Sequence, residues 1–150
     1  MEDLTVTHAR LAGIVADAFG GTDEGTYAKL VVDGRDLYAR VDDKADSLTL
    51  WGFWSRPLTN ANAGLARAMA NRVNTGELAP RVSIHTTDKG ESYLLCDQAV
   101  TTALGLTDGQ IVAFLDAVSQ DTVAALEFFD STYAEEFGAD APATTAEKDA

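Results

Sequence analysis

The stretch that says most about the fold is residues 48–58, which read Leu-Thr-Leu-Trp-Gly-Phe-Trp-Ser-Arg-Pro-Leu. Successive side chains of a β-strand point to opposite faces of the sheet. Leu48, Leu50 and Trp54 would share one face, with Trp51 and Phe53 on the other. A strand that is apolar on both faces is predicted to lie centrally in a sheet or to be covered on both sides. Pro57 cannot donate to a strand ladder, so the strand is expected to end before it.

Two more strands are predicted before this one. Residues 27–32 are rich in β-forming types, and residues 37–41 alternate apolar and polar side chains. Asp33-Gly34 between them is typical of a tight hairpin turn. With residues 48–54 they form a predicted three-stranded antiparallel meander. A helix over residues 6–19 precedes it, because apolar residues recur there at helical spacing and Gly20-Gly21 follows.

The second half of the chain repeats a helix followed by strands. A helix is predicted from Asn60 to Asn74, capped by Thr59 or Asn60. Strands follow over residues 82–87 and 92–100. Thr107-Asp108-Gly109-Gln110 matches a capping box, in which the first and fourth residues exchange hydrogen bonds, so a long helix is expected over residues 108–136.

These elements predict an α+β fold: a helix, a three-stranded antiparallel meander, a helix, two strands and a C-terminal helix. The length of 150 residues suits one domain. We expect that domain to cover residues 1–137. Residues 138–150 consist mainly of Ala, Thr, Asp and Pro, so they are predicted to be a disordered acidic tail.

The composition narrows the classes of partner that the protein could bind. The net charge of −13 opposes binding to nucleic acids or anionic membranes, because such binding requires clustered Lys and Arg. The acidic start Met1-Glu2-Asp3 is unlike a signal peptide, no apolar run reaches the length of a membrane span, and the single cysteine, Cys96, has no partner for an intrachain disulfide. A cytoplasmic protein is therefore expected.

Charge is unevenly spread along the chain. From Asp97 onward eleven acids stand against one base, Lys148, whereas five of the eleven bases fall between positions 56 and 89. Those five are Arg56, Arg67, Arg72, Arg81 and Lys89. The asymmetry could orient a partner, or the acids could simply form a solvated helix face.

No catalytic, metal or cofactor site is predicted. The two histidines, His8 and His85, are far apart in sequence, and a zinc site needs several His or Cys at short spacing. Cys96 alternates with Leu94 on a predicted strand and lacks the basic surroundings of a reactive thiol. The serines lack a nucleophile elbow, and no glycine-rich phosphate loop is present.

Two groups of residues are the candidate partner-binding positions. The first is the aromatic group Trp51, Phe53 and Trp54, which is explained either by core packing or by a groove or dimer face. The second lies on the predicted helix at 60–74, where Leu65 and Met69 belong to an apolar arc beside a flank of small residues, Ala61, Gly64 and Ala68. The arc could cover the sheet, and the flank could permit close approach of another backbone.

The element order resembles the YbjN-domain family, whose fold is that of the bacterial type III secretion chaperones. The resemblance covers about residues 5–135. It is carried by the strand-then-Pro passage 48–58, the helix 60–74 and the ending 107–133, which includes Leu126-Glu127-Phe128-Phe129-Asp130. The resemblance implies a small acidic non-enzymatic domain that holds other polypeptides, with a symmetric homodimer through the middle helix as the first expectation. The acidic tail departs from the family pattern.

The function predicted from these observations is a non-enzymatic protein-binding domain, either chaperone-like or a regulatory adaptor. The alternative is a small-molecule-binding or enzymatic α+β domain with an apolar pocket near Trp51 and Tyr93. The missing nucleophile, base and metal set favours the first. A protein client or regulatory partner and a possible homodimer are the expected partners.

Overall fold

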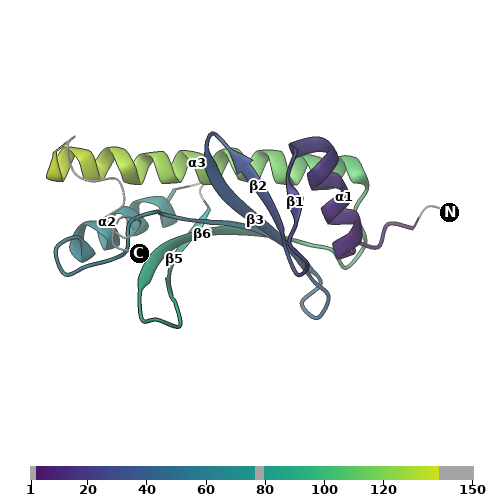
Figure 1. The fold of residues 1–150 in the computed structure, drawn as a ribbon, viewed down its shortest axis with the longest axis horizontal. Helices are drawn as coiled ribbons and strands as arrows, with labels where there is room; N and C mark the ends of the chain where they lie inside the picture. Colours follow the sequence, from purple (N-terminus) through teal and green to yellow (C-terminus); the bar gives the residue numbers. More distant parts are fainter. Residues whose placement is uncertain (1–2, 77–79, 139–150) are drawn as a thin grey trace. The chain divides into compact units, whose positions relative to one another are not determined.

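The computed structural model describes residues 3–76 and 80–138. The elements follow in the order α1 (His8–Phe19), β1 (Thr22–Asp23), β2 (Ala28–Val32), β3 (Arg35–Asp42), β4 (Ser47–Phe53), α2 (Ala63–Asn74), β5 (Arg81–Thr86), β6 (Ser92–Thr101) and α3 (Asp108–Phe137) (Figure 1). The predicted α+β class and element order are confirmed, and the short strand β1 is an addition. The strands form one antiparallel sheet in the order β1-β2-β3-β4-β6-β5, so β4 is a central strand, as its two apolar faces predicted.

Capping residues set the ends of two helices. Thr7 lies before α1, and its side chain accepts a hydrogen bond from the Arg10 N–H at 3.2 Å, so the helix begins at His8 rather than at position 6. Gly20 ends α1 in the left-handed conformation with φ 64°. The capping box before α3 is confirmed: the Thr107 N–H donates to Gln110 Oε1 at 2.8 Å, and the Gln110 N–H donates to Thr107 Oγ1 at 3.1 Å.

The start of α2 differs from the prediction, since the helix begins at Ala63 and not at Asn60. A closed turn precedes it. The Thr59 N–H donates to Asn62 Oδ1 at 2.7 Å, and the Asn62 N–H donates to Thr59 Oγ1 at 3.3 Å. The Asn62 side chain also donates to the Pro57 carbonyl at 3.1 Å, which ties the turn to the end of the preceding segment.

The described chain divides into two compact units. The first unit holds the residues up to Gly52 and Asp97–Val123. Its meander has a tight turn at Asp33 and Gly34, with φ values of 51° and 76°, as the hairpin signal predicted. Helix α1 lies against β1, β2 and β3 (Figure 1). The core face of the meander is fully buried and consists of Ala28, Leu30, Leu37, Ala39, Leu48 and Leu50.

A glycine is required where α1 meets β2. A Cβ placed on Gly21 would lie 2.2 Å from the Lys29 carbonyl oxygen and 2.4 Å from Val15 Cγ1. Val15 is fully buried, so the side chain has no room to move away. The second glycine of the Gly20-Gly21 pair therefore permits the close approach of helix and strand, while the first ends the helix.

The second unit holds Phe53–Cys96 and the residues from Ala124 onward. The segment after β4 pairs with β6 through two backbone bonds, from Trp54 N–H to the Leu94 carbonyl at 3.0 Å and from Leu58 N–H to the Ser92 carbonyl at 2.7 Å. Helix α2 lies against β5 and buries Ala66, Met69 and Val73.

The domain boundaries remain a prediction. Of the predicted tail, residues 139–150 lie outside the described residues. In the ranges 3–76 and 80–138, none of the helices combines the length and apolar character of a bilayer-crossing segment.

Candidate protein interface

The outer face of the first unit's meander carries a cluster of three aromatic rings, Tyr27, Tyr38 and Trp51. Tyr38 on β3 lies opposite Trp51 on β4 in the strand register, and their rings stack with centroids 5.7 Å apart. The Tyr27 ring lies 5.7 Å from Tyr38 and 6.4 Å from Trp51. All three side chains are half-buried. We call this group the aromatic face.

The aromatic face is not needed to fill the core of this unit. The neighbours of Tyr38 and Trp51 along their strands, Leu37, Ala39 and Leu50, are fully buried on the opposite face. Because side chains alternate along a strand, the aromatic rings point to the other side of the sheet. The core face of the meander is therefore aliphatic and buried, whereas the aromatic face is partly exposed to solvent.

The aromatic face has a charged border. Lys29, opposite Tyr38 in the register, places its Nζ 3.6 Å from Asp36 Oδ2. Burial, with the nearby Asp36 charge adding to it, raises the pKa of the Tyr38 phenol. Tyr38 is therefore a neutral phenol at physiological pH. Rings with an apolar body and a polar tip are typical of protein contact surfaces.

Tyr27 and Tyr38 were not among the residues singled out from the sequence. The Asp33-Gly34 turn could have revealed part of the arrangement, because it sets the register that places Lys29 opposite Tyr38. The pairing of Tyr38 with Trp51 depends on the register between β3 and β4, which the longer turn around residues 42–46 sets. The sequence of that turn does not predict its geometry.

Trp54 lies in the core of the second unit and is fully buried. Its ring packs edge-on against Phe129 at 6.0 Å and Tyr133 at 5.8 Å, and its indole N–H donates to Asp130 Oδ1 at 2.9 Å. The Arg56 guanidinium lies 3.7 Å from the centre of the Tyr133 ring, a cation–π contact. Of the two explanations for the aromatic group, core packing therefore applies to Trp54. Phe53 is half-buried, with its ring 5.4 Å from that of His85.

The candidate residues on α2 divide between inside and outside. Met69 is only 2% exposed and belongs to the core, so it is not accessible to a partner. Ala61, Gly64 and Ala68 are exposed, and Leu65 is half-buried. A Cβ added to Gly64 would meet no atom within 4 Å. Gly64 and Ala68 therefore lie on an exposed face of α2, whereas Ala61 lies in the turn before it, because the helix begins at Ala63.

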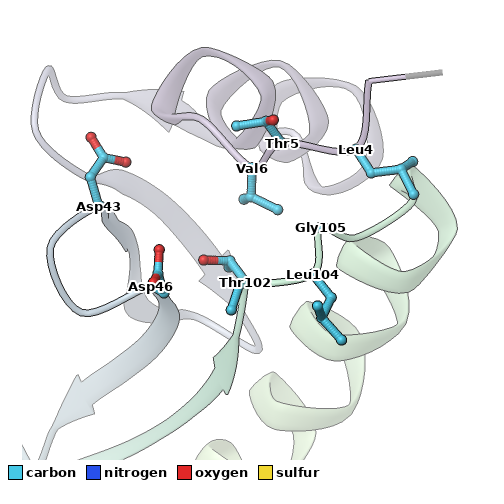
Figure 2. Close-up of a pocket in the computed structure, with 9 residues that line it drawn as sticks. Leu4, Thr5, Val6, Asp43, Asp46, Thr102, Leu104 and Gly105 are labelled. Carbon is cyan, nitrogen blue, oxygen red and sulfur yellow. The ribbon is translucent and has the colours of Figure 1, made fainter. Parts of the chain in front are cut away.

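A cavity of about 490 Å³ lies in the first unit, away from the aromatic face. Three segments line it: the N-terminal residues Leu4–Val6, the turn bearing Asp43 and Asp46, and the loop 102–105 (Figure 2). The Thr102 N–H donates to the Asp46 carbonyl at 2.8 Å, which ties the turn to the loop. Neither Trp51 nor Tyr93 lines this cavity, so it is not the pocket that the sequence alternative placed beside them.

Reactive side chains do not converge in the part of the chain that the structure describes. No three His, Cys, Asp or Glu groups there are placed to share a metal ion. His8 Nε2 lies 2.8 Å from Asp23 Oδ1 in an exposed pair. Cys96 is a buried free thiol.

The family is shown by sequence comparison. The sequence model of the YbjN family, described as "Putative bacterial sensory transduction regulator", matches residues 7–131. The chain belongs to the YbjN family. Among solved structures, YbjN from E. coli aligns with a TM-score of 0.73 over 87% of this chain and 96% of that one. At 13% sequence identity this likeness concerns the fold alone.

Other solved structures resemble this YbjN-family chain more weakly. An uncharacterized protein from Methanothermobacter thermautotrophicus gives a TM-score of 0.50 at 9% identity, over 84% of this chain and 98% of that one. A chain of the HopA1-SchA chaperone-effector complex gives 0.48 at 14% identity, over 81% and 98%, a value from which we argue nothing. No protein with a curated description matches the sequence at a significant level.

Proposed function

We propose that this YbjN-family chain is a non-catalytic, cytoplasmic protein-binding domain of a regulatory system, and that its aromatic face contacts the partner. The observation that carries the proposal is the cluster of Tyr27, Tyr38 and Trp51, whose rings are half-exposed on a sheet face opposite a complete aliphatic core. The family description as a regulator supports the non-catalytic reading.

Tyrosine and tryptophan side chains supply much of the binding energy at protein interfaces, because each buries a large apolar area with little loss of conformational freedom. Stacking between Tyr38 and Trp51 restricts both rings before any partner arrives. The competing account is that the rings only shield the sheet. The two accounts predict different partner binding by a variant that lacks one ring but still folds.

The test is affinity capture with the full chain as bait in the native cytoplasm, with captured proteins quantified by mass spectrometry. Trp51→Ala and Tyr38→Ala should each lower the capture of the same partner by about tenfold, the loss expected when an interface anchor worth about 1.4 kcal/mol is removed. Leu104→Ala is the matched control, because Leu104 is an exposed apolar residue of the same unit, 93% exposed, outside the aromatic face.

Circular dichroism of each variant checks that the fold is intact. Equal capture by wild type, Trp51→Ala and Leu104→Ala would mean that the aromatic face only shields the sheet.

A second proposed contact is the small flank, which consists of Ala61 in the turn before α2 and of Gly64 and Ala68 on the helix, with the half-buried Leu65 beside it. Small side chains let another backbone approach closely, so self-association is the contact we propose for this surface.

A further inference from the structure

Two walls of the cavity in the first unit are held together by hydrogen bonds and close packing. The Leu106 N–H donates to the Leu4 carbonyl at 3.0 Å, so the N-terminal segment lies beside the loop that lines the cavity. Gly105 permits this approach, because its φ is 79° and an added Cβ would lie 2.6 Å from Leu4 Cβ. The Arg10 side chain donates to the Thr5 and Leu106 carbonyls, each at 2.9 Å. Both segments are therefore fixed in place without a ligand.

The third wall is the turn between β3 and β4. Asp42 Oδ1 shapes this turn by accepting the N–H groups of Lys44 at 3.0 Å and Ala45 at 3.2 Å. The carboxylates of Asp43 and Asp46, which line the cavity, take no part in holding it. Neither carboxylate hydrogen-bonds or forms an ion pair with any residue that the structure describes. Two acceptors are thus left for a ligand.

The two sides of the cavity differ in polarity. Figure 2 shows the Asp43 and Asp46 side chains on the side of the turn. Leu4 and Leu104 lie on the opposite side, and Val6 lies between the two groups. Among the described residues, none that lines the cavity is basic or aromatic. A ligand that matches this lining has a positive charge at one end and an apolar body at the other.

Other classes of ligand fit this lining less well. Two carboxylates repel phosphates and carboxylic acids. A planar aromatic ligand would find no ring to stack on. A divalent cation takes about six oxygen ligands, and no three His, Cys, Asp or Glu groups of the described chain are placed to share one. The volume of about 490 Å³ is also far larger than one ion and suits a small organic molecule.

We propose that this cavity binds a primary alkylammonium group. An ammonium group has three N–H donors, which the carboxylates of Asp43 and Asp46 and the Thr102 hydroxyl can accept. Its methylene groups would contact Leu4 and Val6, which removes apolar surface from water. The net charge of −13 also attracts a cation to the molecule.

The same chemistry occurs in a free aliphatic amine and in the lysine side chain of a partner protein. The site lies apart from the aromatic face, so it goes beyond the proposed protein-binding function. Its test does not require that a partner be known.

The test is a titration of the isotope-labelled full chain with n-pentylamine at constant pH and ionic strength, followed by the amide signals in NMR spectra. Pentylamine should shift the amide signals of the lining residues saturably, in the millimolar range expected of so small a ligand. Pentanol and pentanoate have the same carbon chain with a neutral or a negative head group. Each should bind at least about tenfold more weakly, because a charge-assisted hydrogen bond is lost.

A further ligand separates the two sources of the ammonium group. Nα-acetyl-lysine methylamide carries the group on a peptide unit. Tighter binding of this compound than of pentylamine assigns the site to a lysine side chain of a partner. Tighter binding of pentylamine assigns it to a free aliphatic amine.

Two substitutions remove charge from the cavity with little change of shape. Asp43→Asn and Asp46→Asn should each weaken pentylamine binding about threefold, the loss expected of an exposed ion pair. Asp46 is in the left-handed conformation with φ 48°, which asparagine also adopts, so the turn should be kept. Circular dichroism checks the fold. If a variant does not fold, the ligand series on the wild type still tests the proposal.

Asp33→Asn is the matched control. Asp33 is also left-handed, with φ 51°, and it lies in the turn before β3, whereas Asp43 and Asp46 lie in the turn after it. The substitution changes the net charge by the same amount outside the cavity. Asp33→Asn should therefore bind pentylamine as the wild type does.

Equal binding of pentanol and pentylamine would overturn the proposal, because the cavity would then be only an apolar depression. Equal weakening by Asp33→Asn and Asp43→Asn would also overturn it, by assigning the attraction to the net charge. So would amide shifts confined to residues outside the lining. Trp51 does not line the cavity, so Trp51→Ala should bind pentylamine normally, and this test can succeed or fail independently of the partner capture.

Discussion

At the scale of single residues, two tryptophans only three positions apart have different environments. The Trp54 indole donates to Asp130 in the core, whereas no described residue accepts a hydrogen bond from the half-buried Trp51. Replacing each by Phe keeps a ring and removes the N–H. Trp54→Phe is expected to lower the free energy of unfolding by about 1–3 kcal/mol, because the carboxylate loses a partly buried donor. Trp51→Phe is the matched control.

Urea denaturation of both variants gives the comparison. A loss of stability at Trp51→Phe equal to that at Trp54→Phe would mean that ring size, and not the bond to Asp130, accounts for the effect.

Asp23 gives a second residue-scale prediction, which concerns pH. Its Oδ1 accepts the Gly25 N–H at 2.8 Å and contacts His8 Nε2, and these bonds, the one from Gly25 foremost, hold its pKa below 3.8. A carboxyl whose pKa is lowered by folding stabilises the folded state above the unfolded pKa, and that contribution is lost as pH falls through the folded pKa. Near pH 6, the Tm of the wild type should therefore be higher than that of Asp23→Asn, by a few degrees at most.

Melting curves of wild type and Asp23→Asn from pH 6 down to pH 2 check this sign. The difference in Tm should shrink as the pH falls below 3.8. A difference that grows toward acid would contradict the assignment.

At the scale of elements, the junction of α1 and β2 depends on Gly21. Gly21→Ala places a Cβ against the Lys29 carbonyl and the buried Val15, and overpacking of this kind costs about 1–3 kcal/mol. Gly13→Ala is the opposite case, because Gly13 lies inside α1 with nothing within 4 Å of its added Cβ. That substitution should raise stability by about 0.5–1 kcal/mol through helix propensity.

Thermal and denaturant unfolding of both glycine variants measure the two signs. If Gly21→Ala were neutral, α1 could shift away from β2 at little cost, and the close packing would not constrain the fold.

At the scale of the whole molecule, α3 supplies buried side chains to both compact units. Val118 lies in the first unit and Phe129 in the second, 4% and 0% exposed. Val118→Asp and Phe129→Asp each place a carboxyl group in the core without a hydrogen-bond or ion-pair partner. This lowers the free energy of unfolding by several kcal/mol, and the total for a domain is about 5–15 kcal/mol. We expect both variants to lose the cooperative melting transition.

Deletion of residues 138–150 is the contrast, because that segment contains no large apolar side chain. Its removal should leave near-ultraviolet circular dichroism and the melting transition unchanged. A truncated chain that no longer melts cooperatively would refute the assignment of a dispensable tail.

Self-association is also a whole-molecule property. If the α2 flank forms a homodimer, Ala68→Arg should convert dimer to monomer in sedimentation velocity without loss of helicity, because a long charged side chain blocks close backbone approach. Ala113→Arg, at an exposed position of α3, is the matched control and should remain dimeric. A wild type that sediments as a monomer at high concentration would exclude the homodimer and leave only contacts with other proteins.

The sequence by itself determined the order of the helices and of the longer strands, but not the two-residue strand β1, because the signals involved are local. Thr7 and the Thr107–Gln110 pair act within one helical turn, and Asp33-Gly34 shapes a turn of adjacent residues. The two apolar faces of residues 48–54 likewise indicated a central strand. The start of α2 was misplaced because the turn closed by Thr59 and Asn62 uses the same capping residues that begin a helix.

Only the tertiary structure decided which of these residues reach the surface. Trp54 meets Asp130 across 76 positions, and this distant contact makes it a core residue while Trp51 joins Tyr27 and Tyr38 on the aromatic face. The edge position of β5 in the sheet and the bond from its Val82 N–H to Asn74 depend on strand order and on the end of α2. Whether a side chain is buried and which strand edge is paired depend on which distant segments become neighbours. The spacing of residues along one segment does not predict those neighbours.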